Sequence, residues 1–303
     1  MKIAIVGAGA VGGYYGARLA RAGEEVHFLL RADYAAVHER GWRVTDEDGT
    51  WTLAPAHAHD RPETIGACDC VIVAAKTTAN PSLPPLVRPL LGENTILLTL
   101  QNGLGNVEFH AAYAGASRML GGLAFVCLNR VAPGVIEKYI PGSVRLGEMS
   151  GPAQPRTRDL AARFTRAGVD CAAMDSLDLA LWRKLVWNVP FNGLTIAAGG
   201  VTTAVVLARP ELLARAKLLM GEVRAGAAAL GLEIPESFLH RQIEATYPMG
   251  AYKPSSLVDF LAGREVEVEA IWGEPARRAR AAGAKVPHLE ALYAELRQKC
   301  PAA

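Results

Sequence analysis

Three closely spaced glycines follow the first apolar run of the chain, and they constrain the fold more than any other feature. The apolar residues 3–6 lead directly into Gly7-Ala8-Gly9-Ala10-Val11-Gly12 and then into a helical stretch. In a strand, glycine turn and helix of this kind, the first glycine permits the tight turn and the second lets the backbone approach a pyrophosphate. The third allows close packing, and the helix N-terminus faces the anion. We therefore predict that residues 7–12 bind a dinucleotide.

Short apolar runs alternate with helical patterns through the first half of the chain. Buried strands are expected at residues 3–6, 25–30, 69–75 and 95–100, because these runs are apolar and end at residues that break regular structure. This alternation predicts a parallel sheet covered by helices on both faces. A hairpin is expected around Asp46-Glu47-Asp48-Gly49, which two partly alternating runs flank. Prolines between residues 81 and 89 weaken the helical pattern of that segment.

The strand pattern disappears after about residue 174, and helical periodicity replaces it. Apolar residues recur at three- and four-residue spacing in residues 178–194, 210–231, 265–282 and 287–299. Ser176 and Pro287 stand where helices begin, and Gly231 and Gly283 where they end. We therefore expect an α/β protein with a Rossmann-type parallel-sheet domain over residues 1–174, followed by an all-α domain over residues 175–303.

The composition narrows the classes of partner. The 303 residues carry a net charge of only +2, so no overall field attracts nucleic acid or an anionic membrane. No apolar run is long enough for a membrane helix. The five cysteines show no zinc-ligand spacing, so no metal site is expected, and their number fits reduced thiols in a cytoplasm. We expect a cytoplasmic enzyme that acts on a small-molecule substrate. The sequence does not determine the oligomeric state, and a homodimer is one of the states that it allows.

Arg31 ends the second expected strand, where NAD-specific folds carry an acidic residue that binds the ribose 2′-hydroxyl. Glu24 and Glu25 stand at the beginning of that strand and are expected to face away. The guanidinium of Arg31 can instead bind a 2′-phosphate through charge-assisted hydrogen bonds. The alternative is a solvated surface arginine. The sequence therefore favours NADP(H) over NAD(H).

Polar residues also end two further expected strands. Lys76 follows the run that ends at residue 75, and Asn102 follows the run that ends at residue 101. Ligands of open parallel sheets bind outside the carboxyl ends of the strands, which predicts that both residues contact cofactor or substrate. Either can equally be an ordinary loop residue. Gly103 and Gly105 favour a close backbone approach beside Asn102.

A polar stripe lies within an apolar helical segment. Lys184, Asn188 and Asn192 are spaced four residues apart, which places them on one helix face. Buried polar groups need partners or a wet cleft, and the neighbouring aromatic residues leave little of this helix exposed. We favour a cleft over an exposed face. Pro190 should kink the helix and can turn Asn192 off the stripe.

Glu267 is a further acidic candidate, within three alternating glutamates at positions 265, 267 and 269. By pattern alone, alternating glutamates are typical of a solvated face. The residue pattern does not choose among them.

Together these motifs resemble the ketopantoate reductase (2-dehydropantoate 2-reductase) family, and they keep its order and spacing over nearly the whole chain. The matching positions are residues 7–12, Arg31, Lys76, residues 101–103, residues 181–185 with Asn188 and Asn192, Pro254-Ser255, and Gly263-Arg264 before Glu267. The resemblance implies a Rossmann domain, a helical domain and an active site between them. It also implies NADPH as reductant of a branched 2-oxo acid.

The resemblance assigns roles to individual residues. Lys184 becomes the proton donor to the ketone, and Glu267 the partner that orients the lysine or the substrate hydroxyl. Lys76 and Asn102 are expected between nicotinamide and substrate. The residues expected to hold substrate oxygens are Asn188, Asn192 and Ser255, together with Asn102.

Three positions depart from the family pattern and leave the substrate open. Trp272 stands where the family often has asparagine, Gly193 replaces a frequent proline, and Thr202 lies where a substrate-binding asparagine can occur. The resemblance as a whole still implies reduction of ketopantoate to pantoate, as in pantothenate biosynthesis. One alternative is reduction of another 2-oxo acid or an imine by the same residues. The alternative of another class is a non-catalytic NADP(H) sensor.

Overall fold

The computed structural model describes residues 1–300 and divides into two compact units. The first unit contains Met1–Gln101 and Asn106–Leu177, and the second contains Asn102–Gly105 and the chain from Asp178 onward. The four residues 102–105 thus leave the first unit and pack with the helices of the second. None of the helices within residues 1–300 has the length and apolar character needed to cross a membrane.

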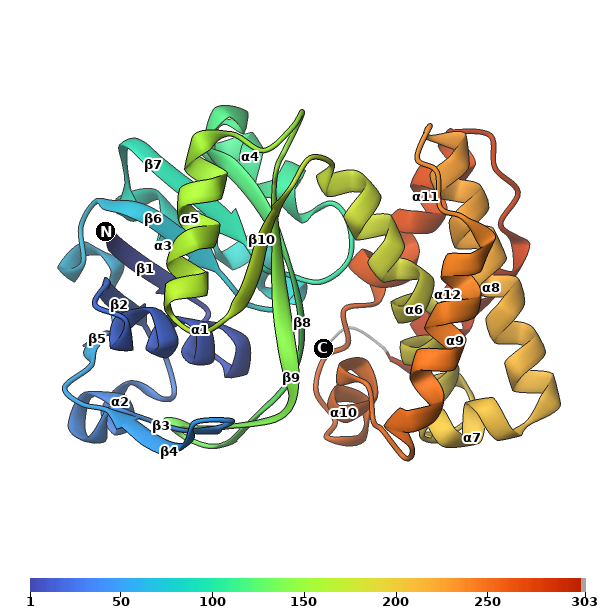
Figure 1. Ribbon diagram of the computed structural model, residues 1–303, viewed down its shortest axis with the longest axis horizontal. Coiled ribbons are helices and arrows are strands. Elements are labelled where there is room, and N and C mark those ends of the chain that lie inside the picture. The colour runs from blue at the N-terminus through green and yellow to red at the C-terminus, as the bar shows by residue number, and fades with distance from the viewer. Residues whose placement is uncertain (301–303) are drawn as a thin grey trace. The chain divides into compact units, whose positions relative to one another are not determined.

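The first unit is built on one mixed sheet in which parallel pairs dominate (Figure 1). Its strands are β1 (Lys2–Val6), β2 (Glu25–Leu29), β3 (Trp42–Asp46), β4 (Gly49–Leu53), β5 (His57–His59), β6 (Cys68–Val73), β7 (Leu91–Thr99), β8 (Met119–Ala132), β9 (Val135–Glu148) and β10 (Asp170–Met174). The order is β4-β3-β9-β8-β7-β6-β1-β2-β5, with β10 beside β9. The chain runs from β1 to β2 on one side and returns to β6 on the other, so the strand order reverses at β1, where open sheets bind ligands.

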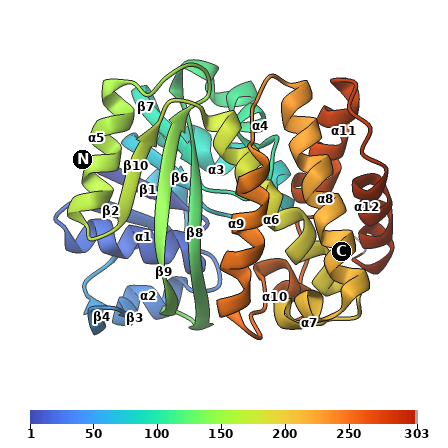
Figure 2. The same ribbon diagram turned by 45° about the vertical axis from the view of Figure 1, so that its right-hand side comes forward.

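Helices cover both faces of this sheet. They are α1 (Ala10–Arg21), α2 (Tyr34–Arg40), α3 (Pro84–Val87), α4 (Asn106–Ala114) and α5 (Pro155–Arg166), with a 3₁₀ segment at Thr77–Ser82. Helices α1 and α5 contact each other on one face, and α4 lies on the other (Figure 2). The apolar side chains of β1, β2 and β7 are buried beneath α1 and α5 as one core. The expected α/β class is confirmed.

The second unit is helical among the residues described. Its helices are α6 (Leu177–Ala197), α7 (Thr203–Ala208), α8 (Pro210–Ala229), α9 (Glu236–Thr246), α10 (Ser255–Leu261), α11 (Glu274–Ala281) and α12 (Pro287–Lys299), with a π-helical turn at Glu269–Gly273. Trp182, Trp272 and Leu292 are buried in its core. The expected starts at Ser176 and Pro287 agree with α6 and α12, and Gly231 follows the last turn of α8 with a φ of +77°.

Parts of this architecture differ from the sequence-based expectation, which did not include β5, β10, α7, α9 or α10. Strands β8 and β9 form a long antiparallel hairpin that the pattern of short parallel strands does not predict. The helix expected over residues 265–282 begins only at residue 269, as a π turn in which the Glu274 N–H donates to the Glu269 carbonyl. Pro275 has no N–H to continue an α-helical ladder back into this turn, which explains the wider geometry. The predicted β3–β4 hairpin is confirmed.

Candidate active site

The glycine turn after β1 has the backbone shape that a dinucleotide requires. Gly7 has a φ of +86°, and a Cβ there would lie 2.3 Å from the Ala75 nitrogen, so only glycine fits. A Cβ at Gly12 would lie 2.6 Å from the Gly7 carbonyl oxygen. The absence of a side chain at Gly12 therefore lets α1 pack close to the strand. A Cβ at Gly9, by contrast, would have no heavy atom within 4 Å beyond its chain neighbours. The turn is therefore closed toward the protein and open at Gly9, and it fits a pyrophosphate.

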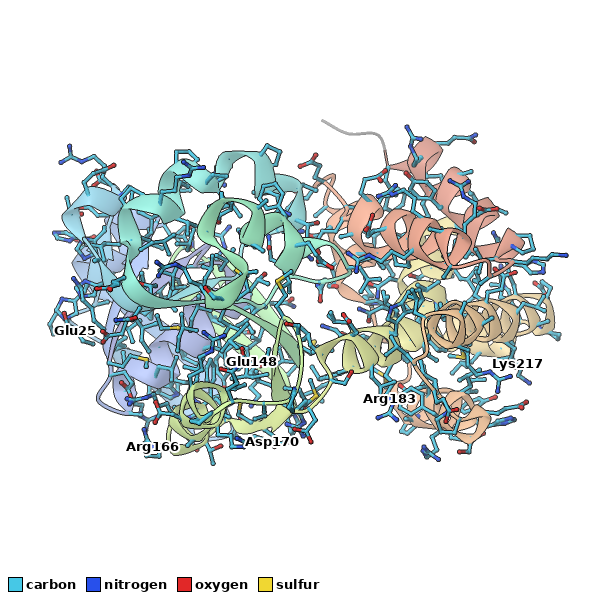
Figure 3. All side chains as sticks on the ribbon, turned by 90° about the horizontal axis from the view of Figure 1, so that it is seen from above. Glu25, Glu148, Arg166, Asp170, Arg183 and Lys217 are labelled. Atoms are coloured by element: carbon cyan, nitrogen blue, oxygen red, sulfur yellow. The ribbon has the colours of Figure 1, made fainter. Side chains whose placement is uncertain are left out.

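Arg31 follows β2 by two residues and is exposed. The acidic residues of this strand are at its other end. Glu25 lies at the edge of the unit (Figure 3) and its carboxylate contacts His27 at 2.9 Å. Glu24 pairs with the N-terminal amine at 2.9 Å and with Arg163 at 2.8 Å. Neither carboxylate stands at the carboxyl end of β2, where the first charged side chain is the exposed guanidinium of Arg31 and the next carboxylate, Asp33, is buried and paired with Arg130.

Lys76 lies three residues beyond β6, the neighbour of β1 in the sheet, and precedes the 3₁₀ segment Thr77–Ser82. Its side chain is half-buried. The predicted position at the carboxyl edge of the sheet, beside the glycine turn, therefore agrees with the structure. Its contact with a cofactor stays a prediction.

Asn102 and Lys184 meet in the second unit. The Lys184 Nζ, on α6, donates a hydrogen bond to Asn102 Oδ1 at 2.8 Å. The turn that carries Asn102 is fixed by its neighbours, since the Leu104 N–H donates to the Ala270 carbonyl at 2.9 Å. Gly103 has a φ of +80°, and a Cβ there would lie 2.1 Å from the same carbonyl oxygen. The π turn around residue 270 thus holds the asparagine against the lysine, a contribution that the sequence pattern did not reveal.

Glu267 provides the negative charge near this lysine. Its side chain is buried, at 8% exposed, whereas the flanking Glu265 and Glu269 are exposed. Burial lowers the pKa of Lys184 from 10.5 to about 8, and the charge of Glu267 acts in the opposite direction. An ammonium with a pKa near the physiological range is a suitable general acid. The structure therefore brings together Lys184, Asn102 and Glu267, which the sequence placed far apart.

Two members of the polar stripe of α6 are buried and Lys184 is half-buried, so this is not an exposed helix face, and the cleft stays a prediction. Asn188 is 9% exposed and Asn192 is 2% exposed. The Asn192 Oδ1 accepts a hydrogen bond from the Ser256 N–H at 3.1 Å, at the first turn of α10. Its amide group therefore holds the segment on which the exposed Ser255 stands. Helix α6 continues through Pro190 to Ala197.

Two family models together match most of the chain. Residues 3–151 match the model described as Ketopantoate reductase PanE/ApbA, and residues 176–300 match that of its C-terminal part. The chain belongs to the ketopantoate reductase family. It is therefore an oxidoreductase, and the resemblance seen in its motifs is confirmed.

Individual relatives of this family extend over the whole chain. A 2-dehydropantoate 2-reductase of Nostoc sp. is 38% identical, over 98% of this chain and 94% of the relative. The crystal structure of the Geobacter metallireducens 2-dehydropantoate 2-reductase has a TM-score of 0.96 and 44% identity, covering 98% of this chain and 99% of that one. A D-mandelate dehydrogenase solved with NADH and anilino(oxo)acetate shares the fold, with a TM-score of 0.90, 21% identity and coverage of 99% and 98%.

The departures from the ketopantoate reductase pattern have a packing explanation at two positions. Trp272 is fully buried, and its Nε1 donates to the Val189 carbonyl at 2.9 Å. A Cβ at Gly193 would lie 2.9 Å from that same Nε1. The small residue on α6 therefore makes room for the large one on the π turn. Thr202 precedes α7 and is half-buried.

Proposed function

We propose that this chain reduces 2-dehydropantoate (ketopantoate) to pantoate with NADPH, as in pantothenate biosynthesis. The observation that carries the proposal is the group of Lys184, Asn102 and the buried Glu267, in which an ammonium of lowered pKa is hydrogen-bonded to an amide oxygen. A non-catalytic sensor has no need of such a proton donor. Family membership and full-length similarity to 2-dehydropantoate 2-reductases support the same reaction.

The proposed proton donor is the Lys184 ammonium. It polarises the ketone oxygen and transfers a proton to it as negative charge develops there, so the product is a 2-hydroxy acid. When bound, NADPH would supply the hydride that adds to the carbonyl carbon. Because burial lowers the pKa of Lys184 to about 8, the lysine is mostly protonated at pH 7 and yet gives up its proton readily.

The residues around the lysine orient it and the substrate. Asn102 holds the Nζ at 2.8 Å, which limits the directions in which the ammonium can point. Glu267 keeps the lysine protonated through its charge. For the substrate carboxylate and hydroxyl groups, we propose hydrogen bonds from Asn188, Asn192 and Ser255.

The cofactor is proposed to be held by the first unit. The open face at Gly9 and the N-terminus of α1 suit the pyrophosphate, and Arg31 suits a 2′-phosphate. Lys76 and Asn102 are proposed at the nicotinamide end. This gives the domains their roles, with NADP binding in residues 1–174 and catalysis and substrate binding in residues 175–303.

A panel of 2-oxo acids with NADPH tests the proposal. Ketopantoate should give the highest kcat/KM, and pantoate should form in a 1:1 ratio with NADPH consumed. A higher kcat/KM with a straight-chain or aromatic 2-oxo acid would favour the alternative of a related substrate. NADPH binding without NADPH oxidation would favour a sensor. The methyl ester of the same acid should be a poor substrate, because polar groups that bind the carboxylate would be incompletely matched.

We further propose that the enzyme acts in the cytoplasm on a small molecule and binds no nucleic acid. The five cysteines are free thiols, which fits a reducing compartment. A homodimer stays a prediction, and light scattering on the purified protein tests it.

A further inference from the structure

A buried chain of hydrogen bonds runs through the first unit beside the loops that carry Lys76 and Asn102. It begins at Tyr113 on α4, passes through the 3₁₀ segment that follows Lys76, and returns to Asn106 at the start of α4. Its members are Tyr113, His110, Gln101, Thr99, Asn80 and Asn106. His110 is fully buried and Gln101 is 6% exposed. None of these side chains has a part in the proposed chemistry.

The chain of hydrogen bonds has a defined direction. Gln101 Oε1 accepts a hydrogen bond from the Thr99 hydroxyl at 3.0 Å and lies 2.7 Å from His110 Nε2. Because a carbonyl oxygen only accepts, the proton of the neutral imidazole is on Nε2 and donates to Gln101. The other ring nitrogen, Nδ1, then accepts from the Tyr113 hydroxyl at 2.7 Å. Burial lowers the pKa of His110 to about 4, so this neutral tautomer persists at pH 7.

The other end of Gln101 joins two strand-end loops. Its Nε2 donates to Asn80 Oδ1 at 2.7 Å, and Asn80 Nδ2 donates to Asn106 Oδ1 at 3.2 Å. Gln101 is the residue immediately before Asn102 in the sequence. Asn80 lies in the segment Thr77–Ser82, which Lys76 precedes. The amide of Gln101 therefore ties the loop after β7 to the loop after β6.

We propose that His110 is a positioning residue for the reduction: its Nε2–H fixes the Gln101 amide, and this amide sets the positions of the loops that carry Lys76 and Asn102. The inference rests on the proposed function, in which both residues lie at the nicotinamide end of the cofactor. Small displacements matter there, because a shift of about 1 Å in a reacting geometry can cost roughly 100-fold in rate.

Two substitutions of His110 separate positioning from simple packing. His110→Leu fills similar space but removes the donor to Gln101. His110→Gln offers an amide nitrogen in place of Nε2 and should restore the bond. We expect kcat with NADPH and ketopantoate to fall about tenfold or more in His110→Leu and to recover to within about threefold of wild type in His110→Gln.

A binding measurement gives a readout independent of turnover. The fragment 2′,5′-ADP carries the adenosine and 2′-phosphate but no nicotinamide, so its dissociation constant should be unchanged in His110→Leu. Val144→Ala is the matched control, because it removes buried methyl groups from β9 of the same unit without touching the chain of hydrogen bonds. It should lower the melting temperature and leave kcat near wild type.

The outcomes distinguish this inference from the proposed function. A wild-type enzyme that does not reduce any 2-oxo acid overturns the function itself. An active wild type with unchanged kcat in His110→Leu, or with no recovery in a folded His110→Gln, overturns the positioning role alone. Weakened 2′,5′-ADP binding in His110→Leu, or an equal loss of kcat in Val144→Ala, would reduce His110 to a stabilising residue.

Discussion

The pH dependence of turnover should report the ionisation of Lys184. A general acid must be protonated, and burial lowers the pKa of this lysine to about 8. With rising pH, kcat should therefore fall to about half of its plateau at pH 8 and to roughly a tenth at pH 9. The assay is NADPH oxidation at saturating NADPH and ketopantoate between pH 6 and 10.

Removing the charge of Glu267 should shift the descending limb of the pH profile, where kcat falls with rising pH, to lower pH. The carboxylate raises the pKa of Lys184, in opposition to burial. In Glu267→Gln the lysine keeps its burial but loses the favourable charge, so its pKa should fall and the descending limb should shift to lower pH. A nearby opposite charge typically shifts a pKa by about 1 to 3 units, which corresponds to about 1.4 to 4 kcal/mol.

Glu265→Gln is the matched control for this shift. Glu265 lies two residues from Glu267 and is exposed, so its loss should leave the limb in place. If kcat stays constant from pH 6 to 10, or if the limb does not move in Glu267→Gln, the assignment of Lys184 and Glu267 is refuted. An equal shift in both variants would show that the pKa of Lys184 responds to the net charge of the protein rather than to the buried carboxylate of Glu267.

Three further predictions concern the cofactor, the substrate and the fold of the site. NADPH should bind at least about tenfold more tightly than NADH, and Arg31→Ala should abolish the difference; equal dissociation constants in the wild type would contradict this. Asn192→Asp loses the amide donor and puts a carboxyl group at a position that is 2% exposed, so the KM for ketopantoate should rise about 10- to 150-fold and the melting temperature should fall; an unchanged KM would remove Asn192 from the substrate site. Gly103→Ala places a Cβ 2.1 Å from the Ala270 carbonyl oxygen, so calorimetry should show a lower melting temperature together with reduced kcat; a native melting temperature would mean that the turn adapts.

Local patterns predicted the parts of the fold that local physics determines. The strand and glycine turn at residues 2–12 were predictable because the positive φ at Gly7 admits only glycine at low cost. The helix starts at Ser176 and Pro287 followed from capping preferences in the same way.

The long β8–β9 hairpin was not predictable from such patterns. Gly121 and Gly122 lie inside β8, where glycine normally argues against a strand. A Cβ at these positions would lie 2.4 Å from the Leu177 side chain and 2.5 Å from that of Leu100, respectively. Tertiary packing therefore requires the two glycines, and no short sequence window contains that information.

The candidate site was predictable to a similar extent. Helical periodicity alone placed Lys184, Asn188 and Asn192 on one face of α6. The choice of Glu267 among three alternating glutamates needed more, because burial distinguishes it only once the π turn has formed. The bond between His110 and Gln101 likewise depends on how α4 packs against the end of β7.

The most direct test of the proposed reduction compares wild type and Lys184→Ala for NADPH binding and for ketopantoate turnover. Both proteins should bind NADPH with nearly equal affinity, and the wild type should form one pantoate for each NADPH consumed. If Lys184 is the proton donor, the variant should lose about 10²- to 10⁴-fold in kcat. Near-native kcat in Lys184→Ala, or a wild type that binds NADPH and reduces no 2-oxo acid, would contradict the proposed chemistry.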